Sequence, residues 1–189
     1  MSKAHRQNLY PFMKLAFQEL VFSRAFELTP RLFDSTNIKT ILQFINVEIS
    51  MDTPLVKEFM YNVPVSKVWQ ALTSTEKLKE WYFPQLREFK PVIGFKFEFN
   101  DDNAGYQKEW IVTKVVEGKT LAHSWAYKGY PGISEVIFDL IPDNGTTRLR
   151  ITQTDLESFP SHPHFQRERF ALGWDNLLGQ NLKQLLEIN

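Results

Sequence analysis

The last part of the chain, from about Phe165 to Glu187, has the hydrophobic pattern of an amphipathic helix. Its apolar positions recur at helical spacing and are Phe170, Trp174, Leu177, Leu178, Leu182 and Leu185. Charged residues such as Arg167, Asp175 and Lys183 fall largely outside this stripe. A stripe of this breadth must pack against another surface, because large apolar side chains are unfavourable in water.

Before this helix, apolar and polar residues alternate with the two-residue period of β-strands. Phe95, Phe97 and Phe99, for example, alternate with Lys96 and Glu98. Turn-prone glycine, asparagine and proline residues separate the segments. The predicted strands are Leu55 to Tyr61, Gln85 to Lys90, Gly94 to Asn100, Gly105 to Glu117, Lys119 to Lys128, Gly132 to Ile141 and Thr146 to Asp155. The alternation predicts an antiparallel sheet with one apolar face.

Two short helices are predicted after the first strand. Pro64 suits the start of a helix near Val65, because the fixed φ of proline fits the first helical turn. The buried face of this helix is predicted to be Val65, Val68, Trp69 and Leu72. Thr73 or Ser74 can cap the second helix, which closes with Leu78 and Trp81. Thr73 lies three residues before a glutamate, as in a capping box.

These elements predict an α+β fold with a curved antiparallel sheet and a long C-terminal helix. A helix laid across the concave face of a twisted sheet can enclose a pocket between the two layers. The apolar residues either fill a dry core or line a cavity that admits a ligand, and the pattern leaves both open. Gly173 and Gly179 favour the cavity slightly, because glycine inside a helix costs about 1 kcal/mol relative to alanine.

Residues 1–50 differ in composition from residues 51–189. All 8 glycines and all 5 tryptophans follow Met51. Two amphipathic helices are predicted in the first segment, Pro11 to Glu27 and Ser35 to Val47. Three interpretations remain open for it: a helical extension that docks on the domain or on a partner, a mobile or partly ordered arm, or a biological start at Met51. We predict one domain over residues 51–189.

Composition and charge exclude several classes of protein. Hydrophobic residues make up 43% and charged residues 23% of the 189 residues, which is typical of a globular domain. The 22 basic and 22 acidic residues balance, which argues against nucleic acid as a partner. The lack of cysteine excludes disulfides and thiol catalysis, and fits the cytoplasm. No stretch approaches the roughly 18 to 20 apolar residues of a membrane-spanning helix.

Residues with catalytic or metal-binding chemistry are few. His123 shares a strand face with Trp125 and Tyr127 and could exchange protons, but a structural role is the stronger interpretation because no carboxylate lies nearby in the sequence. His162 and His164 fall short of a zinc signature. Weaker candidates are Glu109 and Tyr106, and the amides of Gln180 and Asn181, which would need partners if buried against the apolar stripe. We predict no metal, no cofactor and no catalytic residue.

The order of several motifs resembles one known superfamily. The motifs are Pro64-Val65-x-x-Val68-Trp69-x-Ala71-Leu72-Thr73, Leu78-Lys79-Glu80-Trp81, Gly94 before the phenylalanine strand, the strand pair from Trp110 to Trp125, and Gly173-Trp174-x-x-Leu177. Residues 51–189 are similar to the SRPBCC, or START-like, superfamily. Within it, the chain most resembles the homologues of the activator of the 90-kDa heat-shock chaperone's ATPase. This resemblance implies a helix-grip fold, in which a curved sheet wraps the C-terminal helix around a hydrophobic pocket.

The resemblance implies three classes of function: binding of a small hydrophobic or amphipathic ligand, a co-chaperone or interaction module, and a cyclase-like or dehydratase-like enzyme. The resembling co-chaperone usually needs a separate N-terminal domain, and residues 1–50 are too short to form one. We predict ligand binding without catalysis, with a small apolar molecule as partner and a chaperone as the alternative. The predicted pocket residues are Trp69, Phe97, Trp110, His123, Trp125, Phe138, Phe170 and Trp174.

Overall fold

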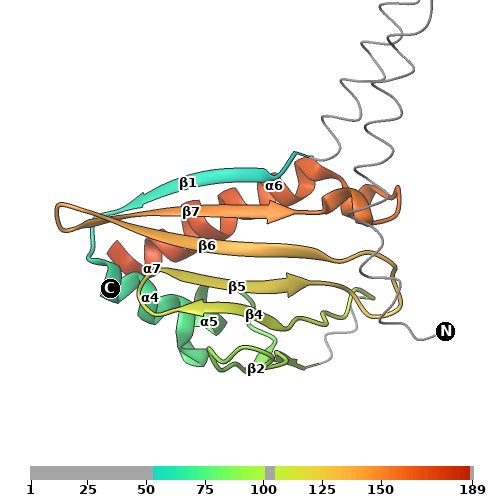
Figure 1. Cartoon of the computed structure of the whole chain (residues 1–189), viewed down its shortest axis with the longest axis horizontal. Helices are drawn as coiled ribbons and strands as arrows, with labels where there is room; N and C mark the ends of the chain where they lie inside the picture. Colours follow the sequence, from blue (N-terminus) through green and yellow to red (C-terminus); the bar gives the residue numbers. More distant parts are fainter. Residues whose placement is uncertain (1–52, 101–104, 188–189) are drawn as a thin grey trace, which may run out of the picture. The chain divides into compact units, whose positions relative to one another are not determined.

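The computed structural model describes residues 53–100 and 105–187. The predicted N-terminal helices, Pro11 to Glu27 and Ser35 to Val47, and the predicted boundary near residue 50 lie outside these ranges. The described residues form a five-stranded antiparallel sheet, a separate two-stranded hairpin and a set of helices (Figure 1). The α+β helix-grip architecture predicted from the sequence is confirmed.

The five strands of the main sheet are ordered β1-β7-β6-β5-β4, as Figure 1 shows. Their bounds are β1 Leu55–Tyr61, β4 Val112–Val116, β5 Thr120–Trp125, β6 Ser134–Asp143 and β7 Thr146–Thr154. Between β6 and β7, Asn144 and Gly145 have φ values of 46° and 87°. A two-residue hairpin turn of this kind needs positive φ at both positions, which asparagine and glycine tolerate.

The alternation along the strands places the apolar residues on one face of the sheet. Val136 and Phe138 of β6 are buried, whereas the intervening Ile137 and the following Asp139 are only half-buried. Leu149 of β7 is likewise fully buried. The inner face is therefore the one that the sequence predicts.

The predicted strand Gly94 to Asn100 is regular over only two residues. Strand β3, Glu98–Phe99, pairs with β2, Leu86–Glu88, with a register shift in β2. The preceding residues run beside the start of β4 and bond to it through single backbone contacts, such as Phe97 N to Trp110 O at 2.9 Å. The resulting hairpin, residues 86–99, lies beside the main sheet without joining its regular ladder.

Two short helices follow β1, as predicted. They are α4, Val65–Thr73, and α5, Thr75–Trp81. Ser74 caps α5, because its hydroxyl accepts a hydrogen bond from Lys77 N at 3.3 Å. The predicted capping box at Thr73 does not form, since the Thr73 hydroxyl instead donates to Trp69 O at 2.7 Å.

The C-terminal helix changes its winding in the middle. Two single turns, η1 Leu156–Ser158 and η2 Pro163–Phe165, lead into α6, Arg167–Asn176; a π-helical segment, η3 Leu177–Leu182, follows, and then α7, Lys183–Glu187. The buried residues recur every four positions and are Phe170, Trp174, Leu178, Leu182 and Leu186. The predicted stripe needs a correction. Leu177 and Leu185, which it includes, are only partly buried, whereas Leu186, which it does not include, is buried.

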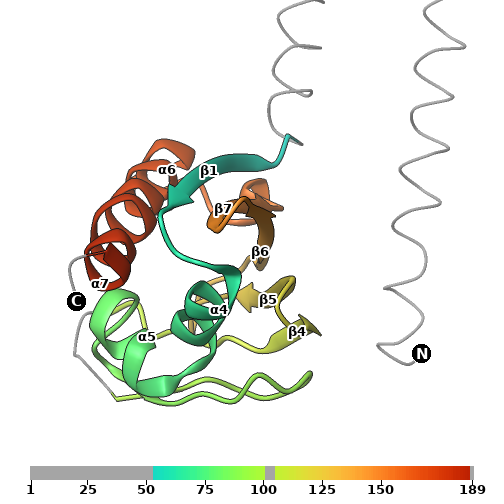
Figure 2. The same cartoon turned by 90° about the vertical axis from the view of Figure 1, so that its left-hand side faces the viewer.

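The helices α4, α5 and the C-terminal helix lie on the same face of the curved main sheet (Figure 2). Tyr61 of β1 donates from its hydroxyl to Leu178 O in the π-helical segment at 3.0 Å, and so ties the sheet to the helix. None of the described helices is long and apolar enough to cross a membrane.

Candidate functional site

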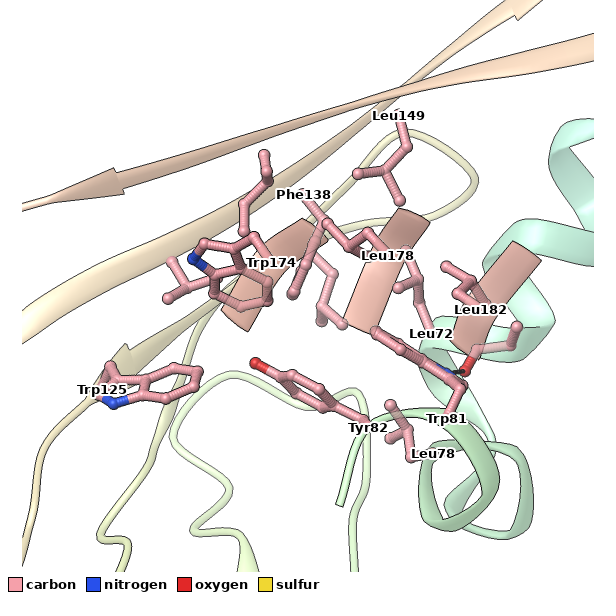
Figure 3. Close-up of a cluster of buried hydrophobic side chains, with 14 of the residues drawn as sticks. Leu72, Leu78, Trp81, Tyr82, Trp125, Phe138, Leu149, Trp174, Leu178 and Leu182 are labelled. Atoms are coloured by element: carbon pink, nitrogen blue, oxygen red, sulfur yellow. Dashed lines mark hydrogen bonds between the residues drawn. The ribbon is translucent and has the colours of Figure 1, made fainter. Parts of the chain in front are cut away.

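The space between the sheet and the C-terminal helix is filled by aromatic side chains around Tyr82. This residue directly follows α5 and is 4% exposed. Its ring centroid lies 4.7 Å from that of Trp81, 6.1 Å from that of Trp174 and 6.2 Å from that of Phe138. Figure 3 shows Tyr82 pointing into the interior, with its hydroxyl towards Trp125 and Trp174. The short helix α5 thus delivers one aromatic residue to the centre of the fold.

Tyr82 forms a buried polar pair with His123 of β5. The Tyr82 hydroxyl and His123 Nε2 are 3.1 Å apart, and His123 Nδ1 is 2.8 Å from the Ser124 carbonyl oxygen. A carbonyl oxygen can only accept, so Nδ1 carries the hydrogen and donates it. Nε2 of the neutral ring is then an acceptor, and the Tyr82 hydroxyl donates to it. The tautomer of His123 follows from these two contacts.

Burial keeps both members of this pair uncharged. It lowers the pKa of His123 to about 4 and raises the pKa of Tyr82 well above its ordinary value. An efficient acid–base catalyst has a pKa near the working pH. Near neutrality neither side chain meets this condition, so the pair is suited to hydrogen bonding rather than to proton transfer.

A narrow space remains beside this pair, but it is too small for a water molecule. It is lined by the side chains Leu72, Leu78, Tyr82, Phe89, Phe97, Leu121, His123 and Phe138. Of the two alternatives that the sequence leaves open, the dry core is the one found at this space between the described residues. Any ligand that enters here must displace a side chain or a wall.

The eight residues predicted to line the pocket occupy different positions. Three of them, Phe97, His123 and Phe138, line the narrow space. Around these, Trp110, Trp125 and Trp174 form a continuous group, with ring centroids 4.2 Å apart for Trp110 and Trp125 and 5.5 Å apart for Trp125 and Trp174. Their contact with a ligand stays a prediction.

The other two predicted residues lie further out. Phe170 contacts Trp125 at 6.2 Å between ring centroids. Trp69 is half-buried on α4, and within residues 53–100 and 105–187 it makes no ring contact with the other seven. Phe170 thus belongs to the edge of the aromatic group, and Trp69 packs against the core from outside it.

Sequence reasoning missed the central residue. Tyr82 stands in the triplet Trp81-Tyr82-Phe83, three consecutive aromatic residues at the end of a predicted short helix. Such a run is a usable signal, because large aromatic side chains dominate the burial energy of a core. Of the remaining residues that line the space, Phe89 was not singled out either.

Two buried indole groups near the interior differ in their hydrogen bonding. Trp174 Nε1 donates to Gln153 Oε1 at 2.8 Å, and Gln153 Nε2 donates to Ser134 Oγ at 2.9 Å. Trp110 Nε1, by contrast, is buried with no hydrogen-bond partner among the described residues. An unpaired buried N–H group is costly, so Trp110 presents a donor that an acceptor atom would satisfy.

The weaker polar candidates, Glu109, Tyr106, Gln180 and Asn181, do not line the space beside Tyr82 and His123. Asn181 is exposed and donates to Trp81 O at 3.2 Å, so the amide is not buried in the stripe; Gln180 is also exposed. Glu109 is exposed as well. His164 stacks on Tyr106, with ring centroids 3.6 Å apart.

His162 and His164 act within the turn that precedes α6. His162 Nδ1 accepts a hydrogen bond from His164 N at 3.1 Å, and Pro163 begins η2. The turn leads directly into α6, the first part of the C-terminal helix. Among the described residues, no group of three or more histidine, aspartate or glutamate side chains is arranged to hold a metal ion.

Comparison with known proteins identifies similar sequences and folds. The family model of the activator of Hsp90 ATPase homolog 1-like protein matches residues 62–187, more than half of the chain. A search of curated protein sequences gave no significant match.

Several solved structures share the fold. Protein MLL2253 from Mesorhizobium loti is 27% identical with a TM-score of 0.57, over 72% of this chain and 98% of that one. The Aha1 dimer from Colwellia psychrerythraea is 22% identical, with a TM-score of 0.56, over 72% and 97%. PFC0360w, an HSP90 activator from Plasmodium falciparum, is 20% identical, with a TM-score of 0.56, over 70% and 95%. At these last two identities the similarity shows the fold alone.

Proposed function

The chain belongs to the activator of Hsp90 ATPase homolog 1-like family, and from this premise we propose that its helix-grip domain binds a small hydrophobic or amphipathic ligand between the sheet and the C-terminal helix. The observation that carries the proposal is the buried pair of Tyr82 and His123 beside the residual space. The pair is hydrogen-bonded within the closed core, and the Tyr82 hydroxyl oxygen, which donates to His123, keeps lone pairs that can accept a hydrogen bond from a ligand. Trp110 Nε1, buried without a partner among the described residues, adds a second polar contact that a ligand could use.

The lining favours a ligand with an uncharged buried part. Of the side chains around the narrow space, six are apolar and the other two, Tyr82 and His123, are neutral. A charged group placed there would lose its hydration without a partner of opposite charge. An apolar or aromatic body with a hydroxyl or carbonyl oxygen fits the lining, and any charged head would stay outside.

Native mass spectrometry of the full chain tests this proposal. Incubation with a panel of lipids and neutral aromatic metabolites should give a complex with one ligand per chain. Binding of the same compound should weaken in Tyr82→Phe, which loses the hydroxyl but keeps the ring. A wild-type protein that binds no compound of the panel, and carries none from its expression host, would refute ligand binding.

A chaperone is the second candidate partner, and the family itself favours it. The proposal is distinct from ligand binding because it needs a surface rather than the interior. Stimulation of a 90-kDa chaperone's ATPase by the full chain would support it, and no stimulation at saturating concentration would exclude it. The lack of cysteine supports the cytoplasmic setting that we propose for either partner.

A further inference from the structure

We propose that the β2–β3 hairpin, residues 86–99, is the wall that opens to admit the ligand, and that the hydroxyl of Thr75 helps to hold it shut. The inference rests on the proposed ligand binding, since it gives a route into the closed interior.

The hairpin is one wall of the narrow space beside Tyr82 and His123. Phe89 and Phe97, which are 4% and 7% exposed, point from it to the same space as Leu121 and Phe138 of the main sheet. At its tip, Val92 and Ile93 are 59% and 65% exposed.

The other walls are fixed more firmly. Strand β5, which carries Leu121 and His123, is paired on both sides, with β4 and with β6. Helix α5 is fixed to α4 because Trp81 Nε1 donates to Ala71 O at 2.9 Å inside the core. The C-terminal helix is fixed to β1 through the buried hydroxyl of Tyr61. Moving any of these walls would break a ladder of the five-stranded sheet or a buried side-chain hydrogen bond.

The hairpin is attached to the main sheet through a short seam with residues 110–112, where β4 begins. Three backbone bonds are found there in the described part of the chain: Gly94 N to Val112 O, Val112 N to Phe95 O and Phe97 N to Trp110 O, at 2.8 to 2.9 Å. Segments with few ladder bonds open at lower free energy than the strands of a continuous sheet. The seam is therefore the place where the interior can open without unfolding the sheet.

Thr75 fastens the opposite side of the hairpin. Its Oγ1 donates to Phe89 O at 3.0 Å and accepts from Phe89 N at 3.2 Å. One hydroxyl thus satisfies both backbone groups of a residue whose side chain lines the space, as a neighbouring strand would do. Because Thr75 is the first residue of α5, this contact joins the hairpin to the helix that carries Tyr82 inward.

A disulfide across the seam provides the first test. Lys96 and Ile111 face each other as antiparallel partners, and the bonds on either side make them a non-hydrogen-bonded pair. Their Cα atoms are then about 4.5 Å apart, within the range that a disulfide spans. The natural chain has no cysteine, so Lys96→Cys with Ile111→Cys forms a single defined cross-link.

The oxidised double variant should take up the neutral fluorescent probe N-phenyl-1-naphthylamine at least tenfold more slowly than the wild type. Reduction with dithiothreitol should restore the rate, and each single cysteine variant should behave like the wild type. Uptake at the wild-type rate in the oxidised variant would overturn the hairpin as the route.

Thr75→Val provides the second test, with Thr73→Val as its matched control. Both threonines donate to a backbone carbonyl, but the contact of Thr73 stays within α4. In Thr75→Val, hydrogen exchange of amides 86–99 should accelerate at least tenfold and probe uptake should accelerate several-fold, with exchange in β6 and β7 unchanged. Thr73→Val should change neither. Acceleration spread equally over β6 and β7 would overturn the proposal, because it reports general destabilisation.

The two proposals fail separately. If the wild type takes up neither this probe nor any compound of the panel, ligand binding is refuted. Hydrogen exchange of amides 86–99 still tests whether the hairpin opens in that case. If the hairpin opens locally, Thr75→Val should accelerate this exchange and the disulfide should suppress it.

Discussion

At the scale of single residues, the buried pair of Tyr82 and His123 is the main chemical feature of the interior. Tyr82 donates to His123 Nε2, and His123 donates to a backbone carbonyl, so every polar atom of the pair has a partner. The pair is stable only while the imidazole is neutral, because a protonated ring would be charged and buried among aromatic side chains. Part of the pH dependence of the fold's stability should therefore come from His123.

We expect His123→Gln to remove part of the acid sensitivity of the fold. The pKa of His123 is about 4 in the folded protein, below the value of about 6.5 in an unfolded chain. Its contribution is fully present above pH 6.5 and is lost as the pH falls towards 4. Between about pH 7.5 and 4.5, this group should cost the wild type roughly 2 to 3 kcal/mol of unfolding free energy.

Urea unfolding at the two pH values measures this effect. Glutamine does not titrate and can still accept from Tyr82, so the variant should lose less stability on acidification than the wild type. Carboxylates elsewhere contribute equally to both proteins and cancel in the difference. Equal losses in the two proteins would show that His123 is not the responsible group.

At the scale of elements, the C-terminal helix is adapted to a four-residue repeat. Its buried residues, from Phe170 to Leu186, are spaced by four, whereas an α-helix has 3.6 residues per turn. Each step of four would rotate the buried position by about 40°, so a regular helix would carry the later leucines away from the sheet. The wider π-helical turn at Leu177–Leu182 compensates for this drift. Tyr61 supports the segment by bonding to Leu178 O.

The two glycines of this helix should respond differently to alanine. A Cβ at Gly173 would meet nothing within 4 Å, so Gly173→Ala should raise the unfolding free energy by up to about 1 kcal/mol through helix propensity. A Cβ at Gly179 would lie 3.2 Å from Cε1 of Phe59, so the same change there should gain less or destabilise. Thermal and urea unfolding of the two variants compare them directly. A larger gain at Gly179 than at Gly173 would contradict this account of the packing.

At the scale of the whole molecule, the described residues contain a hydrophobic core that joins the first strand to the last helix. Its buried apolar side chains form one cluster that runs from Leu55 in the first strand to Leu186 in the last helix. The first and last elements meet, because Lys57 of β1 pairs with Asp175 of α6. A domain closed in this way should not need the preceding fifty residues to fold.

Residues 51–189 should therefore fold on their own. We expect a fragment that begins at Met51 to unfold cooperatively in urea, with a far-ultraviolet circular dichroism spectrum typical of a mixed α+β protein. Its denaturant dependence should match the surface area of a domain of its size. A fragment that is unfolded or unfolds without cooperativity would place the domain boundary before residue 51.

The sequence by itself determined the elements and the faces that they bury. Three of these features are local patterns: the strand alternation in β6 and β7, the Asn144-Gly145 turn and the apolar stripe of the last helix. Each follows from the geometry of a strand, a turn or a helix, so it can be recognised from residues close together in the sequence. The order of the motifs along the chain also indicates the family to which the chain belongs, and the match over residues 62–187 confirms that family. These features depend on neighbouring residues, so a single sequence suffices to predict them.

Only the tertiary structure decided what fills the interior. Tyr82 and His123 are 41 residues apart, and nothing local in either segment indicates that the two side chains meet. The same holds for the contact of Thr75 with Phe89, the separation of the hairpin from the main sheet and the π-helical turn. Whether an apolar face becomes a pocket or a packed core depends on how side chains from distant elements fill a shared volume. That volume exists only once the helix has closed over the sheet.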